Sequence, residues 1–369
     1  MRGFFAIVQW MASQITHILA GEDALGEALP DRAERILSGY GAWFRLGCQG
    51  PDIFYHNQRT RPVSLHFGTL AHRRGYGSLV AALVSQAAGA GAESAWGAWT
   101  LGFSTHAAVD RWTHPFIVHR SGWSDPARPE TAAFRSCHPF YERLLDALLW
   151  ERRKGGPVRG FRQAAALIPA GGLPVTFPRR LAEALRQAYP ARAAGDVLLE
   201  RRLANAFEDS AFLYLHSDPS VTGLGGLDAK GYEYLDDESG PRSVAIVYPE
   251  DFSREVDWAN ESGAAWTHPC EPPRRSTASY HELVAMAAHD AASALAATAG
   301  ALDGSDGDAA GLEAAVGDGT LNVGDADGAQ ARPVHMDPLP LPELMARQYR
   351  MRLNQAARSN AIDRGADGI

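Results

Sequence analysis

The sequence contains few cysteines and lacks several patterns that would assign it at once to a large protein class. Its three cysteines, Cys48, Cys137 and Cys270, are far apart and odd in number, which argues against a disulfide framework and against a CxxC zinc site. No run of about 18 charge-free apolar residues occurs, so we expect no transmembrane helix. We also find no P-loop, no glycine-rich dinucleotide-binding turn and no internal repeat.

Positive charge is scarce as well, because the net charge is −8 at pH 7 and no long basic run is present. An acidic chain is a poor generic binder of polyanions, so we expect no stable binding of nucleic acid, and a phosphate-bearing substrate would need the charge of a metal to hold it. The composition, 46% apolar and 21% charged, is otherwise that of an ordinary globular protein with enough residues for one large domain or two.

The N-terminal segment, residues 1–17, carries one arginine and a short apolar run. A signal peptide would have this start, but the run is broken at Gln9, no clear cleavage site follows, and cleavage beyond it would endanger His17. We therefore expect an uncleaved cytoplasmic chain, with secretion as the alternative.

Histidine is abundant in the first part of the chain, where eight of the 13 histidines precede residue 140. In the stretch 102–119, GFSTHAAVDRWTHPFIVH, the residues His106, Asp110 and His114 are spaced four apart. On a helix these side chains share one face over two turns, and imidazole and carboxylate there can converge on one metal ion or bridge two. A single pair with this spacing is common on solvated helices, but three in register among small apolar residues indicate a metal site. Because Pro115 disfavours helix at the preceding residue, we expect the helix to end at His114.

Other candidate ligands surround this stretch in the sequence. His17 lies on a predicted helix, and Asp52 follows a Gly-Pro turn, where it could equally form an Asx-turn or cap a helix. Of the histidines that follow, His66 is flanked by apolar residues and is the predicted ligand, whereas His72, beside two arginines, is expected to be solvated.

A second pair with helical spacing, His138 and Glu142, follows Ser136 at the start of another predicted helix. Glu142 alone could simply complement the helix dipole, but together with His106, Asp110 and His114 it is a candidate metal ligand. Asp146 continues the same face and could orient a ligand histidine.

Apolar residues recur with helical period over most of the chain, so we expect an all-α fold, a multi-helix bundle with a metal cleft and long irregular loops. One helix is expected on each side of Pro30, and others near 178–189 and 194–215, after a cap near Ser276 to Ser279, and over 341–358. The expected domains are a helical domain over 1–299, a flexible Gly/Asp-rich acidic loop over 300–340, and a C-terminal helix and tail over 341–369.

Taken in chain order, these motifs resemble the bacterial zinc-dependent phospholipase C family, which is related to single-strand-specific zinc nucleases. The motifs are His17, GPD at Asp52, His66, HxxxDxxxHP from His106 and HxxxE from His138, and a fainter likeness covers residues 266–283. The resemblance implies an all-α fold with two to three Zn²⁺ ions that hydrolyses a phosphodiester between glycerol and a phosphorylated head group. It assigns the first zinc to Asp52, His66, His106 and Asp110, the second to His114, His138 and Glu142, and part of a third to His17 and Asp110.

Two departures from the family pattern matter. The spacing from Asp110 to His114 is shorter than in the secreted enzymes, which makes His119 a competing ligand, and Met1 precedes His17 by sixteen residues, so the amino group that those enzymes use at the third zinc has no obvious counterpart.

The expected activity is phospholipase C-type cleavage of a glycerophospholipid, with Asp52 both a zinc ligand and the residue that orients the attacking water or accepts its proton. The expected partners are a phospholipid or another phosphodiester substrate and a transient contact with a membrane surface. The alternatives are a nuclease or phosphomonoesterase on the same zinc site, and a zinc-binding protein without turnover.

Overall fold

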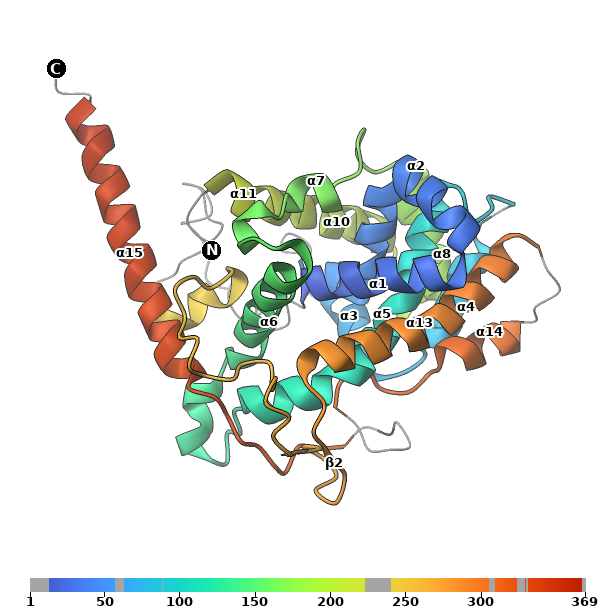
Figure 1. Ribbon diagram of the computed structural model, residues 1–369. Helices are drawn as coiled ribbons and strands as arrows, with labels where there is room; N and C mark the ends of the chain where they lie inside the picture. The colour runs from blue at the N-terminus through green and yellow to red at the C-terminus, as the bar shows by residue number, and fades with distance from the viewer. Residues whose placement is uncertain are drawn as a thin grey trace.

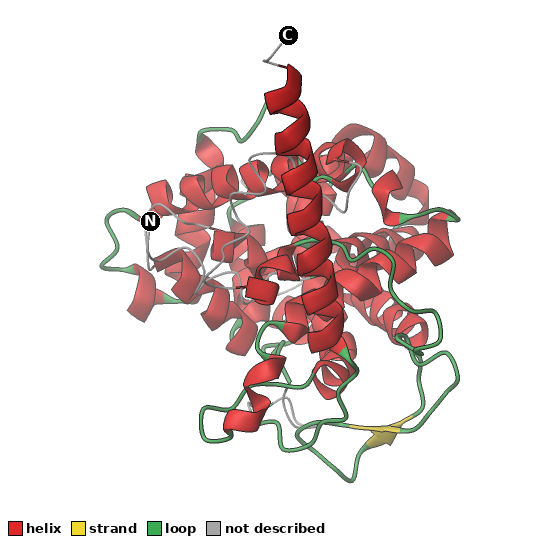
Figure 2. Cartoon of the chain, turned by 90° about the vertical axis from the view of Figure 1, so that its left-hand side faces the viewer, coloured by secondary structure: helices red, strands yellow, loops and turns green. Residues whose placement is uncertain are grey.

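The computed structural model describes residues 13–56, 63–87, 89–222, 240–304, 309–323, 329 and 331–366. As predicted, the fold is all-α. Within the described residues the only sheet is a pair of two-residue antiparallel strands, β1 (Trp266–Thr267) and β2 (Arg275–Ser276), near the lower edge of Figure 2.

Most connections between helices are short in the first half of the chain, whereas the second half has longer segments between helices, such as 247–279 and 317–340. In chain order the helices are α1 (Gln14–Ala28), α2 (Pro30–Cys48), η2 (Gly50–His56), α3 (Val63–Arg73), α4 (Tyr76–Ser85), α5 (Ala95–Ser121), η3 (Pro129–Phe134), α6 (Cys137–Lys154), η4 (Val158–Gly160), α7 (Gln163–Leu167), α8 (Thr176–Ala188), α9 (Pro190–Ala193), α10 (Leu199–His216), α11 (Pro219–Thr222), η5 (Gly240–Ile246), α13 (Tyr280–Leu302), α14 (Ala309–Val316) and α15 (Leu341–Ala366).

Helix α5 is the centre of the bundle. It packs against α2 and α13 and also touches α1, α4 and α6, and Figure 1 shows it running alongside α13 beneath α1. Nearly every side chain from Trp96 to Asp110 is buried, because α5 is covered on all sides rather than amphipathic. The fold therefore places the predicted ligands His106, Asp110 and His114 in the middle of the core.

Two glycines allow α2 and α5 to touch through their backbones. A Cβ at Gly47 would lie 2.1 Å from the Trp99 carbonyl oxygen, and a Cβ at Gly102 would lie 2.0 Å from the Phe44 carbonyl oxygen. Any side chain at either position would force the helices apart. This close approach brings the end of α2, and η2 after it, against the ligand face of α5.

The prediction that the central helix ends at His114 is wrong. Helix α5 continues through Pro115 to Ser121. A proline inside a helix costs about 3 kcal/mol through its missing N–H and its steric clash. The turns beyond it bury Phe116 and Ile117 almost completely, at 0% and 1% exposure, and the burial of two large apolar side chains offsets a cost of that size.

The C-terminal part of the chain returns to the bundle. Helix α13 begins with the capping box of Ser279 and Glu282, and α15 runs along the face turned toward the viewer in Figure 2. The expectation of a flexible loop over 300–340 is wrong for two of its segments: 309–316 forms α14, and 317–323 packs on α4 and α5. The segment is acidic and rich in glycine, but its apolar residues Leu312, Val316 and Leu321 are buried and hold it against the bundle. No helix of the described residues is long and apolar enough to cross a membrane.

Candidate metal centre

Asp110 lies at the centre of a buried cluster of histidines. Its Oδ1 is 3.3 Å from His17 Nε2 and 3.5 Å from His114 Nε2, and its Oδ2 is 3.2 Å from His106 Nε2 and 3.6 Å from His72 Nε2. The carboxylate is 1% exposed. One acidic side chain is thus shared by four imidazoles, which come from α1, α3 and α5.

The orientation of three of these rings fixes which nitrogen faces Asp110. A backbone carbonyl can only accept a hydrogen bond, so a ring nitrogen paired with one must carry the hydrogen. The carbonyls in question are those of Gly68 for His72 Nδ1 (2.7 Å), Cys48 for His106 Nδ1 (3.1 Å) and Leu321 for His114 Nδ1 (2.8 Å). Each neutral ring therefore points the lone pair of Nε2 into the cluster, as metal-binding histidines do.

The donor set fits a metal cation. Lone pairs of Nε2 face carboxylate oxygens, and like acceptors at this distance in a buried site need either a proton or a cation between them. His106 Nε2 and both oxygens of Asp110 are buried without a hydrogen-bond partner, although His106 Nε2 lies only 3.2 Å from Asp110 Oδ2. Ligands at zinc bond lengths of about 2.0–2.1 Å in a tetrahedron lie about 3.3 Å apart, close to the 3.2–3.6 Å separations around Asp110.

The possible ligands of the described residues form three groups whose donor atoms lie within 4.8 Å of one another. These groups are His17, His106 and Asp110; Asp52, His72 and His106; and His114, His138 and Glu142. The first two share His106, and Asp110 contacts His114 of the third. Seven of the predicted ligands are thereby brought together.

The remaining predicted ligand, His66, has its side chain outside the described part of the chain. The expectation that His72 is solvated is wrong: His72 is 5% exposed, and its Nε2 lies 3.1 Å from Asp52 Oδ1. Neighbouring residues on a helix point about 100° apart, so the exposed Arg73 and Arg74 do not carry His72 to the surface with them. The missed signal is that His72 lies four residues after the buried Gly68, on the same face of α3.

Of the two competing histidines, His114 joins the cluster and His119 does not. His119 stacks on His335 with ring centroids 5.4 Å apart and packs against Trp266. Burial and the neighbouring Arg120 lower the pKa of His119 to about 4, so that it is neutral. It belongs to the packing between α5 and the C-terminal segment, and to none of the metal groups.

The third group lies where α5 meets α6. Glu142 Oε1 is 3.4 Å from His114 Nε2 and 3.3 Å from His138 Nε2. Burial alone would raise the pKa of Glu142, but the two histidines outweigh it and lower that pKa to about 2. The His138 side chain is 24% exposed, whereas the others are nearly inaccessible, so the described residues leave the cluster open to solvent on this side.

In the metal-free protein, neighbouring charges favour the ionised forms of Asp110 and His114. Burial opposes ionisation of Asp110, but His106 and His114 hold its pKa well below its usual range. Conversely, burial lowers the pKa of His114 while Asp110 and Glu142 raise it to about 9. The buried carboxylates of the cluster therefore need positive charge near them, supplied by protons on the histidines or by a metal ion.

The GPD turn is shaped around His106. Gly50 has φ +54°, and a Cβ there would lie 2.4 Å from His106 Cγ, so glycine is needed both for the backbone conformation and for space. The turn presents Asp52, 5% exposed, whose Oδ2 is buried without a hydrogen-bond partner. Asp52 is thus not merely a cap.

Asp146 has a different function from the one predicted for it. Its carboxylate accepts hydrogen bonds from the backbone N–H groups of Gln14 (2.8 Å), Ile15 (3.0 Å) and Thr16 (2.8 Å), and from the Ser13 hydroxyl. It therefore fixes the first turn of α1, and with it His17, rather than orienting a ligand histidine directly.

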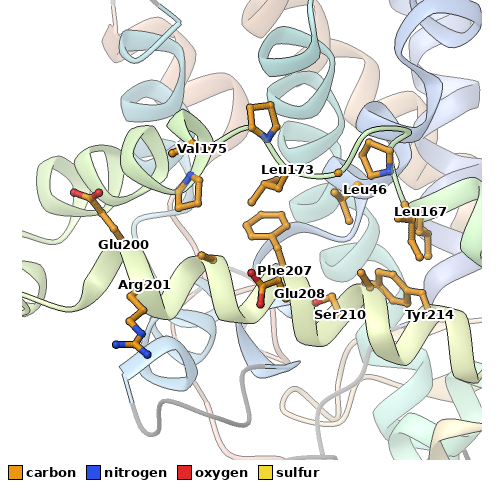
Figure 3. A pocket seen from close by; sticks show the side chains of 17 residues that line it. Leu46, Leu167, Leu173, Val175, Glu200, Arg201, Phe207, Glu208, Ser210 and Tyr214 are labelled. Atoms are coloured by element: carbon orange, nitrogen blue, oxygen red, sulfur yellow. The ribbon is translucent and has the colours of Figure 1, made fainter. Parts of the chain in front are cut away.

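An apolar cavity of about 490 Å³ lies apart from the ligand cluster, between α10 and the segment that joins α7 to α8. Figure 3 shows Leu173 and Leu46 near Phe207, with Glu200 and Arg201 at one end and Ser210 and Tyr214 at the other. Ser210 links this wall to η2, because its hydroxyl lies 2.6 Å from His56 Nδ1. None of the candidate ligands lines the cavity.

Comparison with known proteins agrees with this site. No curated protein and no solved structure matches the chain. Residues 16–197 match the family described as zinc dependent phospholipase C, and all the candidate ligands from His17 to Glu142 lie within the matched residues. With this match, the helical fold and the cluster around Asp110, residues 16–197 of the chain belong to the zinc-dependent phospholipase C family.

Proposed function

We propose that the protein is a zinc-dependent phosphodiester hydrolase that cleaves glycerophospholipids in the manner of a phospholipase C. The observation that carries the proposal is the convergence of four imidazole Nε2 atoms on the buried Asp110 carboxylate, within residues that match the family. Two to three Zn²⁺ ions would be held by the three ligand groups, with His72 in the place that the sequence assigned to His66.

Bound zinc would neutralise phosphate oxygens and make an attacking water more acidic. The protein's own residues supply the geometry. Gly68, Cys48 and Leu321 hold three imidazoles with Nε2 turned inward, and Asp110 spans the groups on either side of it. The solvent-accessible side at His138 is where a substrate head group and water would enter.

Asp52 is the proposed acceptor of the proton from water. Its two oxygens differ, because Oδ1 faces His72 Nε2 at 3.1 Å while the buried Oδ2 has no hydrogen-bond partner. A carboxylate with one oxygen committed to the metal group and the other free to accept a proton can both bind and act as a general base.

The proposed substrate follows from charge as well as from the family. A chain of net charge −8 is a poor binder of long polyanions, which favours a phospholipid over single-stranded nucleic acid. A zinc-binding protein without turnover would need a closed ligand shell, and the exposure of His138 argues against that alternative.

The test is hydrolysis by the zinc-loaded protein of four substrates: phosphatidylcholine in vesicles, a soluble bis-aryl phosphodiester, an aryl phosphomonoester and single-stranded DNA. We expect release of diacylglycerol and phosphocholine from the lipid and slower cleavage of the soluble diester. Preferential cleavage of DNA or of the monoester would replace the lipid proposal by the corresponding alternative, and no hydrolysis by protein that retains zinc would favour a binding protein.

Asp52→Asn separates the two proposed functions of this residue. The amide keeps an oxygen that can face the metal but cannot accept a proton at neutral pH, so kcat is expected to fall by about 10²–10⁴-fold with zinc content largely retained. An unchanged kcat would remove Asp52 as the base, and complete loss of zinc would assign it to metal binding alone.

A further inference from the structure

The segment 317–323, GDGTLNV, which we call the strap, lies more than a hundred residues beyond the family match and yet touches the ligand cluster. Leu321 is fully buried, and Thr320 and Val323 are 4% and 6% exposed. The strap is therefore a packed part of the fold and not a surface loop.

One residue of the strap bonds to two different ligand groups. The Leu321 N–H donates to the His72 carbonyl at 2.8 Å, and the Leu321 carbonyl accepts from His114 Nδ1 at 2.8 Å. The Thr320 hydroxyl adds a second bond to the His72 carbonyl at 3.2 Å. His72 belongs to the group with Asp52, and His114 to the group with Glu142, so the backbone of a single residue, Leu321, sets the position of one ligand and the ring orientation of another.

The strap is fixed at its start by the side chain next to Asp110. Arg111 donates from Nη1 to the Val316 carbonyl at 2.6 Å, and from Nη2 to the carbonyls of Gly317 at 2.9 Å and Gly319 at 3.4 Å. Gly317 has φ +78°, and a Cβ there would lie 3.0 Å from Arg111 Nη1. The planar guanidinium can serve several carbonyls at once, which the ammonium of lysine cannot do with the same geometry.

A second anchor holds the strap to the start of α4. The Asp318 carboxylate accepts from the Ser78 N–H at 3.0 Å and from the Ser78 hydroxyl at 3.0 Å. The Asp318 carbonyl accepts from the Gly75 N–H, and that of Gly317 from the Gly77 N–H. The strap is thus tied to both α4 and α5 before it reaches the ligands.

We propose that the strap, held by Arg111 and Asp318, positions His72 and His114 for metal binding, so that a segment outside the family match completes the metal centre. This inference rests on the proposed zinc centre. Groups that hold a ligand histidine by its second nitrogen typically change metal affinity or activity by about 10–100-fold when they are lost.

Two variants, Arg111→Met and Asp318→Ala, test the proposal because simple electrostatics predicts opposite signs for them. Removing a positive charge beside Asp110 would by itself tighten the binding of a cation, and removing the negative charge of Asp318 would weaken it. If the strap positions the ligands, both variants are expected to bind zinc more weakly, by about 10-fold or more. Arg111→Lys keeps the positive charge but loses the planar guanidinium that donates to several carbonyls. It is expected to weaken zinc binding as Arg111→Met does, but to a smaller extent.

The readouts are zinc affinity by competition with a chelator and the visible spectrum after substitution with Co²⁺, which reports ligand geometry without any turnover. The matched control is Asp303→Ala. Like Asp318, Asp303 accepts a hydrogen bond from a backbone N–H, that of Ala92 at 3.1 Å, and it also accepts one from Arg32, but it does not contact any of the candidate metal ligands among the described residues. The control accounts for losses that come from general destabilisation, and it is expected to leave zinc affinity and the Co²⁺ spectrum unchanged.

The outcomes separate the strap from the zinc centre itself. Weaker zinc binding and an altered Co²⁺ spectrum in both strap variants, but not in the control, would support the proposal. Wild-type zinc affinity in both variants, or tighter zinc binding in Arg111→Met, would overturn only the proposal that the strap positions the ligands. A wild-type protein that binds less than one zinc per chain would overturn both this proposal and the proposed zinc centre.

Discussion

In the metal-free protein, raising the pH from 6.5 to 9 is expected to destabilise the fold through His114. Asp110 and Glu142 raise the pKa of His114 from 6.5 to about 9 despite its burial. A group whose pKa is higher in the folded than in the unfolded state contributes stability that is fully present below the unfolded pKa and is lost as the pH rises through the folded pKa.

The size of the effect follows from the two pKa values. A difference between 6.5 and about 9 corresponds to about 3 kcal/mol at 1.36 kcal/mol for each pH unit. The lowered pKa of Glu142 describes the same pair and is not added to this figure. The pKa of His72 is raised as well and acts with the same sign. The lowered pKa values of His56 and His119, about 4, act only below pH 6.5 and leave this window clear.

The assay is urea unfolding of chelator-treated protein at pH 6.5, 7.5 and 9, followed by circular dichroism. Zinc must displace the proton from His114, so the stabilisation by zinc is expected to grow with pH over the same window. His114→Asn, which retains a donor near the Leu321 carbonyl but cannot titrate, is the control and is expected to remove the His114 part of the pH dependence of the metal-free protein, leaving the part that comes from His72. A free energy of unfolding that is constant or rises between pH 6.5 and 9 in the metal-free wild type would refute the coupling.

Two further predictions concern a ligand and the packing of the core. His72→Ala is expected to lower the zinc content of the purified protein, measured by atomic absorption; loss of zinc in His66→Ala but not in His72→Ala would contradict the placement of His72 beside Asp52. Gly102→Ala, whose methyl group would meet the Phe44 carbonyl oxygen at 2.0 Å, is expected to destabilise the fold by about 1–3 kcal/mol in thermal or urea unfolding. Gly26→Ala, at an α1 position with open space around it, is the matched control and is expected to be neutral or to stabilise by up to about 1 kcal/mol.

Much of the candidate ligand set was predictable because it depends on local periodicity. Spacing of four residues puts His106, Asp110 and His114 on one face whatever the rest of the chain does, and the same holds for His138 and Glu142. The all-α fold followed from the same periodicity, which is a strong signal in long helices.

The failures arose where distant contacts outweighed local preference. Pro115 disfavours helix locally, but the burial of the turns beyond it carried α5 through to Ser121. His72 looked solvated because its sequence neighbours are charged, although helix geometry turns them away from it. The strap was not predictable, because its composition is that of a loop and its partners on α3 and α5 lie 248 and 207 residues earlier in the chain.

The central claim is that Asp110 joins the imidazoles into one catalytic zinc centre, and the most direct measurement compares wild type with Asp110→Asn for zinc per chain and lipid hydrolysis on the same preparations. The account predicts two or more zinc ions and diacylglycerol release in the wild type, with loss of both in the variant, because the amide cannot supply the charge that the four facing imidazoles share. Less than one zinc per chain in the wild type, or full zinc content and activity in Asp110→Asn, would contradict it.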